Sequence, residues 1–157
     1  MFACFIGRWI GIDYGTRRVG VAVSDPRARI ASPAGTLPGS GNASTDAAAI
    51  AQWAAEHEAA GIVVGLPLNM DGTDSAQTGL TRKLADELRK RVACPVELWD
   101  ERLSSFQADQ HLAAADVRRS RRRALRDALA AQVILQAFLD AGRPDGDDRE
   151  PAAPPTP

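Results

Sequence analysis

The chain has 157 residues, of which 45% are hydrophobic and 25% are charged, and its formal net charge is -1. This length predicts one domain with a substantial core, because a chain of about 150 residues hides roughly 70% of its unfolded surface. Two cysteines are too few for a disulfide framework, and no run approaches the roughly 18 apolar residues of a membrane span. The composition therefore excludes collagen-like, disulfide-rich and membrane-spanning classes, and it predicts a cytoplasmic protein without a membrane partner.

Three strands and a helix are predicted in the first part of the chain. The apolar run at residues 9–12 predicts a buried strand, and a short turn connects it to a β-branched run at residues 19–23. These two runs predict an antiparallel hairpin. A third strand is predicted near residues 30–36. The alanine-rich stretch at residues 45–60 predicts a helix that Gly61 terminates.

The second part alternates strands with helices. Residues 61–66 predict a buried strand, and residues 74–77 resemble a capping box that opens a helix. Residues 96–101 predict the next strand, a helix is predicted to begin at Ser104, and a last helix is predicted over residues 121–141. This order predicts an α/β fold: a mixed five-stranded sheet with three antiparallel strands first, two further strands joined by helices, and helices on both faces.

Charge is distributed unevenly along the chain. Residues 143–157 hold five of the ten prolines, four acidic residues and two arginines, which predicts a disordered tail after a domain of residues 1–142. Without this tail, 17 basic and 16 acidic residues remain, a net charge of +1. Six of the arginines lie within nine residues, which indicates a local contact with a polyanion: Arg118, Arg119, Arg121, Arg122, Arg123 and Arg126.

Three carboxylates occupy unusual positions. Asp13 ends an apolar strand, where a buried acid is costly unless it is paired; alternatively, it forms the turn. Glu101 ends a predicted parallel strand, at the edge where α/β proteins place their sites; alternatively, it favours the start of the next helix. Asp127 continues the apolar stripe of the last helix, either in an ion pair with Arg123 or as a metal ligand.

Carboxylates on three separate elements suit hard cations such as Mg²⁺. Two such ions can activate a water molecule and stabilise the leaving oxygen of a phosphodiester. The sequence has no zinc-site spacing, no Gly-x-Ser-x-Gly elbow and no Walker loop, so these other chemistries have little support. Whether the three carboxylates converge is left open by the sequence alone.

Four motifs resemble those of one protein family. Residues 11–25 (GIDYGTRRVGVAVSD) are similar to the opening motif of the YqgF (RuvX) family, which comprises Holliday-junction-resolvase-like proteins regarded as pre-16S rRNA nucleases. Residues 65–73, 100–105 and 127–136 resemble the family's second, third and fourth motifs, in the same order. The resemblance covers residues 8–141. It implies an RNase H-like fold and a nuclease that depends on Mg²⁺ or Mn²⁺.

The resemblance also implies roles for individual residues. Carried over position by position, Asp13, Glu101 and Asp127 are the expected catalytic and metal-binding residues. Seven arginines are candidates for holding nucleic-acid phosphates, with solvated charge as the alternative: Arg17, Arg18, Arg102, Arg118, Arg119, Arg122 and Arg123.

The expected substrate is precursor 16S rRNA near its 5′ end, with the small ribosomal subunit as a partner, and branched DNA is the runner-up. Homodimerisation is left open. One alternative function is a non-catalytic adaptor that binds nucleic acid through the arginines. Another is an actin-like or Hsp70-like ATPase, whose first phosphate loop resembles residues 11–16, but this chain is too short for the two domains of such an enzyme.

Overall fold

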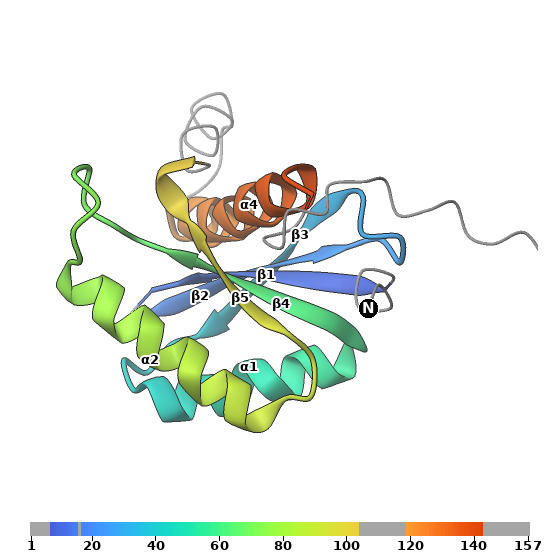
Figure 1. Cartoon of the computed structure of the whole chain (residues 1–157), viewed down its shortest axis with the longest axis horizontal. Helices are drawn as coiled ribbons and strands as arrows, with labels where there is room; N and C mark the ends of the chain where they lie inside the picture. Colours follow the sequence, from blue (N-terminus) through green and yellow to red (C-terminus); the bar gives the residue numbers. More distant parts are fainter. Residues whose placement is uncertain (1–6, 16, 104–118, 143–157) are drawn as a thin grey trace, which may run out of the picture.

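The described residues form a mixed sheet with helices packed against it (Figure 1). The computed structural model describes residues 7–15, 17–103 and 119–142, and for Arg119 and Ser120 only the backbone. The strands are β1 (Arg8–Tyr14), β2 (Arg18–Ser24), β3 (Ala31–Pro38), β4 (Ala59–Leu66) and β5 (Val96–Asp100). The helices are α1 (Ala43–Glu56), α2 (Ala76–Arg91), the short 3₁₀ helix η2 (Glu101–Leu103) and α4 (Arg119–Asp140).

The strand order is β3-β2-β1-β4-β5. The β1–β2 and β2–β3 pairs are antiparallel, whereas β1–β4 and β4–β5 are parallel. The predicted sheet, with three antiparallel strands followed by two strands after intervening helices, is therefore confirmed. Because β1, β4 and β5 run in one direction, their carboxyl ends lie at the same edge of the sheet, where α/β proteins place their sites.

Helices cover both faces of the sheet, as predicted (Figure 1). Helices α1 and α2 lie against one face and α4 lies against the other. Side chains alternate along a strand, so in β1 the residues Ile10, Ile12 and Tyr14 join the core beneath α1 and α2. Trp9 joins the core beneath α4. By the same alternation, Asp13 is directed to the α4 face.

Glycines allow close packing on the α4 face. A Cβ atom at Gly11 would lie 2.7 Å from the Cβ of Leu135 on α4, so the helix approaches β1 more closely than any side chain at that position would permit. A Cβ atom at Gly61 would lie 2.5 Å from the ring of Trp9. This ring in turn packs against Phe138 with a centroid distance of 5.0 Å. These contacts fix the position of α4 over the sheet.

The prediction for the end of the first helix is wrong. Helix α1 ends at Glu56, before the predicted end at Ala60, and the chain turns at Glu58, which has a φ of 53°. Gly61 does not terminate the helix but lies inside β4, where it leaves room for the Trp9 ring. A glycine required for packing therefore has the same local pattern as a helix stop.

Two other boundaries also differ from the predictions. Strand β5 ends at Asp100, and Glu101 begins η2 instead of ending the strand. A capping box does open α2, but it joins Ser75 to Thr78 rather than the ends of residues 74–77. The hydroxyl of Thr78 accepts a hydrogen bond from the Ser75 backbone N–H at 2.8 Å, so threonine replaces the expected glutamine.

Some predictions lie outside the described residues: the helix beginning at Ser104, the residue Arg118, and the tail at residues 143–157 with its domain boundary. They stay predictions. Within the ranges that the structure describes, every helix is too short or too polar to serve as a transmembrane span.

Candidate functional site

Asp13 lies near the carboxyl end of β1, where its register partner across the sheet is Gly20 of β2. Burial raises the pKa of its carboxyl from 3.8 to about 7, and the negative charges of Glu101 and then Asp127 add to the shift. Within the described part of the chain, no group donates a hydrogen bond to this carboxyl. A partly buried acid that faces other acids favours the binding of a proton or a cation.

Glu101 is positioned by the end of β5. As the first residue of η2, it lies against Gly65 of β4, where a Cβ atom would lie 3.0 Å from Oε2 of the glutamate. Continuing the β1–β4 register places Gly65 beside Asp13 on the neighbouring strand. Burial raises the pKa of Glu101, and the negative charge of Asp100 raises it further. A glycine in β4 therefore makes room for a second carboxylate next to Asp13.

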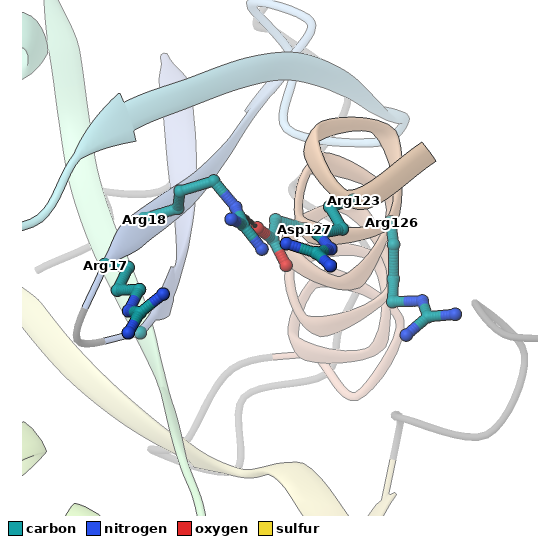
Figure 2. A pocket seen from close by; sticks show the side chains of 6 residues that line it. Arg17, Arg18, Arg123, Arg126 and Asp127 are labelled. Carbon is teal, nitrogen blue, oxygen red and sulfur yellow. Dashed lines mark hydrogen bonds and ion pairs between the residues drawn. The ribbon is translucent and has the colours of Figure 1, made fainter. Parts of the chain in front are cut away.

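Asp127 is brought to the same corner by α4. A Cβ atom at Gly20 would lie 2.0 Å from the backbone oxygen of Asp127, so only glycine permits this approach. Because Gly20 is the cross-strand partner of Asp13, the helix places Asp127 beside that strand end. The Nε of Arg18 donates to Asp127 Oδ2 at 2.6 Å (Figure 2). Asp127 is therefore ion-paired, but with Arg18 of β2 and not with Arg123 of its own helix.

The three predicted acidic residues thus come together at one corner of the sheet, on the side of α4. Carboxylate oxygens are the donors that Mg²⁺ and Mn²⁺ prefer, and a cation there would offset the repulsion acting on Asp13. In the described ranges, no three acidic, histidine or cysteine side chains are placed to hold a metal ion together, and the carboxylate of Asp127 is engaged with Arg18. The chemistry of the three donors suits a divalent cation, but one of them is paired with an arginine in this structure.

A pocket of about 430 Å³ opens beside Asp127. In Figure 2 the guanidinium group of Arg18 is directed at Asp127, with the side chains of Arg17 and Arg126 on either side. Four cationic side chains around one carboxylate suit an anion such as a phosphate group. We call it the arginine pocket, and its lining consists of Gly15, Arg17, Arg18, Arg123, Arg126 and Asp127.

The arginine pocket includes some of the predicted phosphate-binding residues but not all of them. Arg126 lines it although it is absent from the predicted set, whereas Arg122 is not among the lining residues. The sequence spacing could have indicated Arg126, because Arg123 and Arg126 are three residues apart and so share one face of α4. The side chain of Arg119 lies outside the described residues, as does Arg118.

A family model for RuvX, described as Holliday junction resolvase, matches residues 7–141. The chain belongs to the RuvX family. A protein of Myxococcus xanthus (strain DK1622), named "Putative pre-16S rRNA nuclease", is 46% identical over 144 residues, which covers 92% of this chain and 95% of that protein. A protein of the same name from Anaeromyxobacter dehalogenans (strain 2CP-C) is 46% identical over 137 residues, covering 87% and 99%. The family resemblance predicted from the four motifs is confirmed.

Solved structures with a similar fold include RuvC of Thermus thermophilus. The RuvC complex with a Holliday junction substrate has a TM-score of 0.51 and 16% sequence identity, covering 86% of this chain and 94% of that one. A second RuvC structure has a TM-score of 0.50 and 15% identity, covering 85% and 95%. At these identities the similarity establishes the fold alone, and it confirms the predicted RNase H-like class.

In this RuvX chain, Arg102 joins two segments beside Glu101. Its Nη2 lies 2.6 Å from Oδ2 of Asp100, and its Nη1 donates to the backbone oxygen of Met70 at 3.2 Å. The guanidinium group therefore ties the loop between β4 and α2 to the end of β5. A phosphate would have to share Arg102 with these partners, and the predicted phosphate contact of this residue stays a prediction.

Proposed function

We propose that this RuvX chain is a divalent-metal-dependent nuclease that hydrolyses phosphodiester bonds and processes precursor 16S rRNA near its 5′ end. The observation that supports it best is the convergence of Asp13, Glu101 and Asp127 from three separate elements. The pKa of Asp13 is raised to about 7, first by burial and then by the negative charges of Glu101 and Asp127. Perturbed acids in such an arrangement are typical of functional sites.

Asp13, Glu101 and Asp127 would hold Mg²⁺ or Mn²⁺ through their carboxylate oxygens. When bound, such ions activate the attacking water and stabilise the leaving oxygen of the phosphodiester. The arginine pocket supplies the second requirement of the reaction, because its guanidinium groups can bind backbone phosphates and hold the scissile bond in place. These contacts position the substrate and read no base sequence.

The relatives' names support RNA as the substrate, since both proteins described above are named for pre-16S rRNA. Branched DNA is the second candidate, because the matching family model is described as a Holliday junction resolvase. With an RNA precursor of the small ribosomal subunit as substrate, we expect the enzyme to act in the cytoplasm with that subunit as its partner. Homodimerisation stays a prediction.

The test is a cleavage assay with a 5′-extended 16S precursor RNA and a four-way DNA junction, each with Mg²⁺, Mn²⁺ or EDTA. Glu101→Gln and Asp127→Asn serve as variants that keep the shape of the side chain and remove its charge. We expect metal-dependent cutting of the RNA that both variants abolish. Cutting of the junction alone would identify the DNA substrate. Binding of either nucleic acid without cleavage at any metal concentration would favour the adaptor function instead.

A further inference from the structure

Asp127 belongs to two sites at once. Its carboxylate is part of the acidic corner, where its charge contributes to the raised pKa of Asp13, and it also lines the arginine pocket. The Nε of Arg18 lies 2.6 Å from Oδ2 of this carboxylate. Both side chains are only partly exposed, at 38% for Arg18 and 22% for Asp127. One carboxylate is therefore shared between the expected cation and an arginine that faces an anion-binding pocket.

Of the two partners, Arg18 is the one that can move. The backbone at Asp127 is held against the sheet, because its oxygen fills the space where a Cβ atom at Gly20 would lie. Ala128 and Ala131 of the same helix are also buried. Arg18, in contrast, has a long flexible side chain whose guanidinium group borders the open arginine pocket (Figure 2).

We propose that Arg18 is an exchangeable counter-ion of Asp127. When a backbone phosphate of the nucleic acid enters the arginine pocket, the guanidinium group of Arg18 moves from the carboxylate to the phosphate. Asp127 is then released to the divalent cation. This inference rests on the proposed nuclease function and goes beyond it, because it makes the binding of metal and of substrate mutually cooperative. Linkage requires the effect to be reciprocal: a phosphate that draws Arg18 away strengthens metal binding, and metal at Asp127 strengthens phosphate binding.

The charges around the pocket favour this exchange. With Arg18 paired to Asp127, the four arginines and one carboxylate of the lining leave an excess of positive charge that attracts a phosphate. A guanidinium group directed at a carboxylate cannot at the same time make the same hydrogen bonds to a phosphate. Free protein would therefore bind metal weakly, and the complete site would form only on substrate.

The first measurement is Mn²⁺ affinity by electron paramagnetic resonance, using the full chain without nucleic acid. We expect Arg18→Gln to raise the Mn²⁺ affinity on the order of tenfold, because the competitor for Asp127 is gone. Arg123→Gln is the matched control: it removes the same charge from the same pocket but leaves the Arg18–Asp127 pair in place. It should raise the affinity much less. Equal increases in the two variants would show that the affinity rises with the loss of any positive charge from the pocket, and this would overturn the proposal.

The second measurement adds a short single-stranded RNA, whose integrity is checked on a gel. RNA should raise the Mn²⁺ affinity of the wild type and of Arg123→Gln on the order of tenfold, and leave that of Arg18→Gln unchanged. Arg18→Lys, which keeps the charge, should retain part of the coupling and serves if the glutamine variant does not fold. Coupling that persists in Arg18→Gln overturns the proposal while the nuclease function stands. Absence of Mn²⁺ binding in every variant overturns both.

Discussion

Two aspartates on opposite faces of the sheet, Asp46 buried and Asp13 partly buried, differ in what surrounds them. Asp46 at the start of α1 is 2% exposed and accepts hydrogen bonds from the Tyr14 hydroxyl at 2.5 Å and from the Ser40 backbone N–H and hydroxyl at 2.9 and 2.8 Å. Asp13, next to Tyr14 in β1, has Glu101 and Asp127 as its charged neighbours.

The difference separates a structural acid from one that we propose to be functional. The hydrogen bonds to Asp46 tie α1 and the loop before it to β1, and they offset the cost of burying a charge. Asp13 lacks this compensation among the described residues, so its burial costs stability unless a cation is bound. Such a local conflict is expected where a function requires it.

Neutralising each aspartate in turn tests most directly whether Asp13 and Asp46 differ in role. We expect Asp13→Asn to lower cleavage of the precursor RNA by roughly 10³-fold or more, because a residue of the proposed catalytic unit loses the charge that would hold the cation. Asp46→Asn should cleave at a rate near the wild type per folded molecule. Single-turnover rates, scaled by the folded fraction from circular dichroism, test this pair. Similar losses in both variants would show that burial, and not the acidic corner, governs the effect.

The positions of the three candidate site acids could be predicted because each is visible in the local sequence pattern. Asp13 follows an apolar run, Glu101 follows another, and Asp127 interrupts an apolar helical stripe. Alternation along β1 and the parallel order of β1, β4 and β5 then bring them to one edge. The order of elements, with the family motifs, was sufficient for the fold.

Other features depend on contacts that no local pattern contains. Arg18 and Asp127 are separated by 109 positions, and helical spacing suggested only the neighbouring Arg123 as a partner. Asp46 sits near the start of an alanine-rich helix, where an acid ordinarily favours the helix dipole, so nothing in its position indicates burial. Gly61 is the opposite case, because its local pattern is misleading. It makes room for the Trp9 ring, but it follows a predicted helix and so resembles a helix stop.

The two faces also differ in how closely helices approach the sheet, and a pair of glycines tests this. Gly20→Ala places a methyl group against the backbone of Asp127, and we expect the free energy of unfolding to fall by about 3 kcal/mol or more. Gly79→Ala in α2, on the face of Asp46, has open space around it and should raise stability by about 0.5–1 kcal/mol. Urea unfolding measures both. A tolerated Gly20→Ala would mean that α4 is not held at this distance.

The uncompensated burial of Asp13 predicts a dependence of stability on pH. Its pKa is about 7 in the folded protein and 3.8 when unperturbed, so the folded state binds the proton more tightly, and stability is lost as the pH rises from about 4 to about 7. Asp13→Asn has no carboxylate to ionise and so avoids this loss of stability. In EDTA at pH 8 we expect this variant to exceed the wild type by about 2 kcal/mol, below the upper bound of about 4 kcal/mol that the shift sets.

Urea unfolding in EDTA at several pH values checks this expectation. The advantage of Asp13→Asn should vanish near pH 4 and stay constant above pH 7, with Asp46→Asn as the comparison that shows no such gain. A wild type as stable as Asp13→Asn at pH 8 would contradict the absence of compensation at Asp13.

A modest effect is expected from removing the tyrosine hydroxyl that donates to Asp46. Tyr14→Phe keeps the buried ring and removes one donor to Asp46, and we expect unfolding to become easier by about 1–2 kcal/mol, since Ser40 still donates twice. Cleavage per folded molecule should not change, because the side chain of Tyr14 faces α1 and α2 while Asp13 faces α4. A large loss of cleavage with unchanged stability would mean that the two aspartates communicate through β1, and the division into a structural and a functional acid would then be wrong.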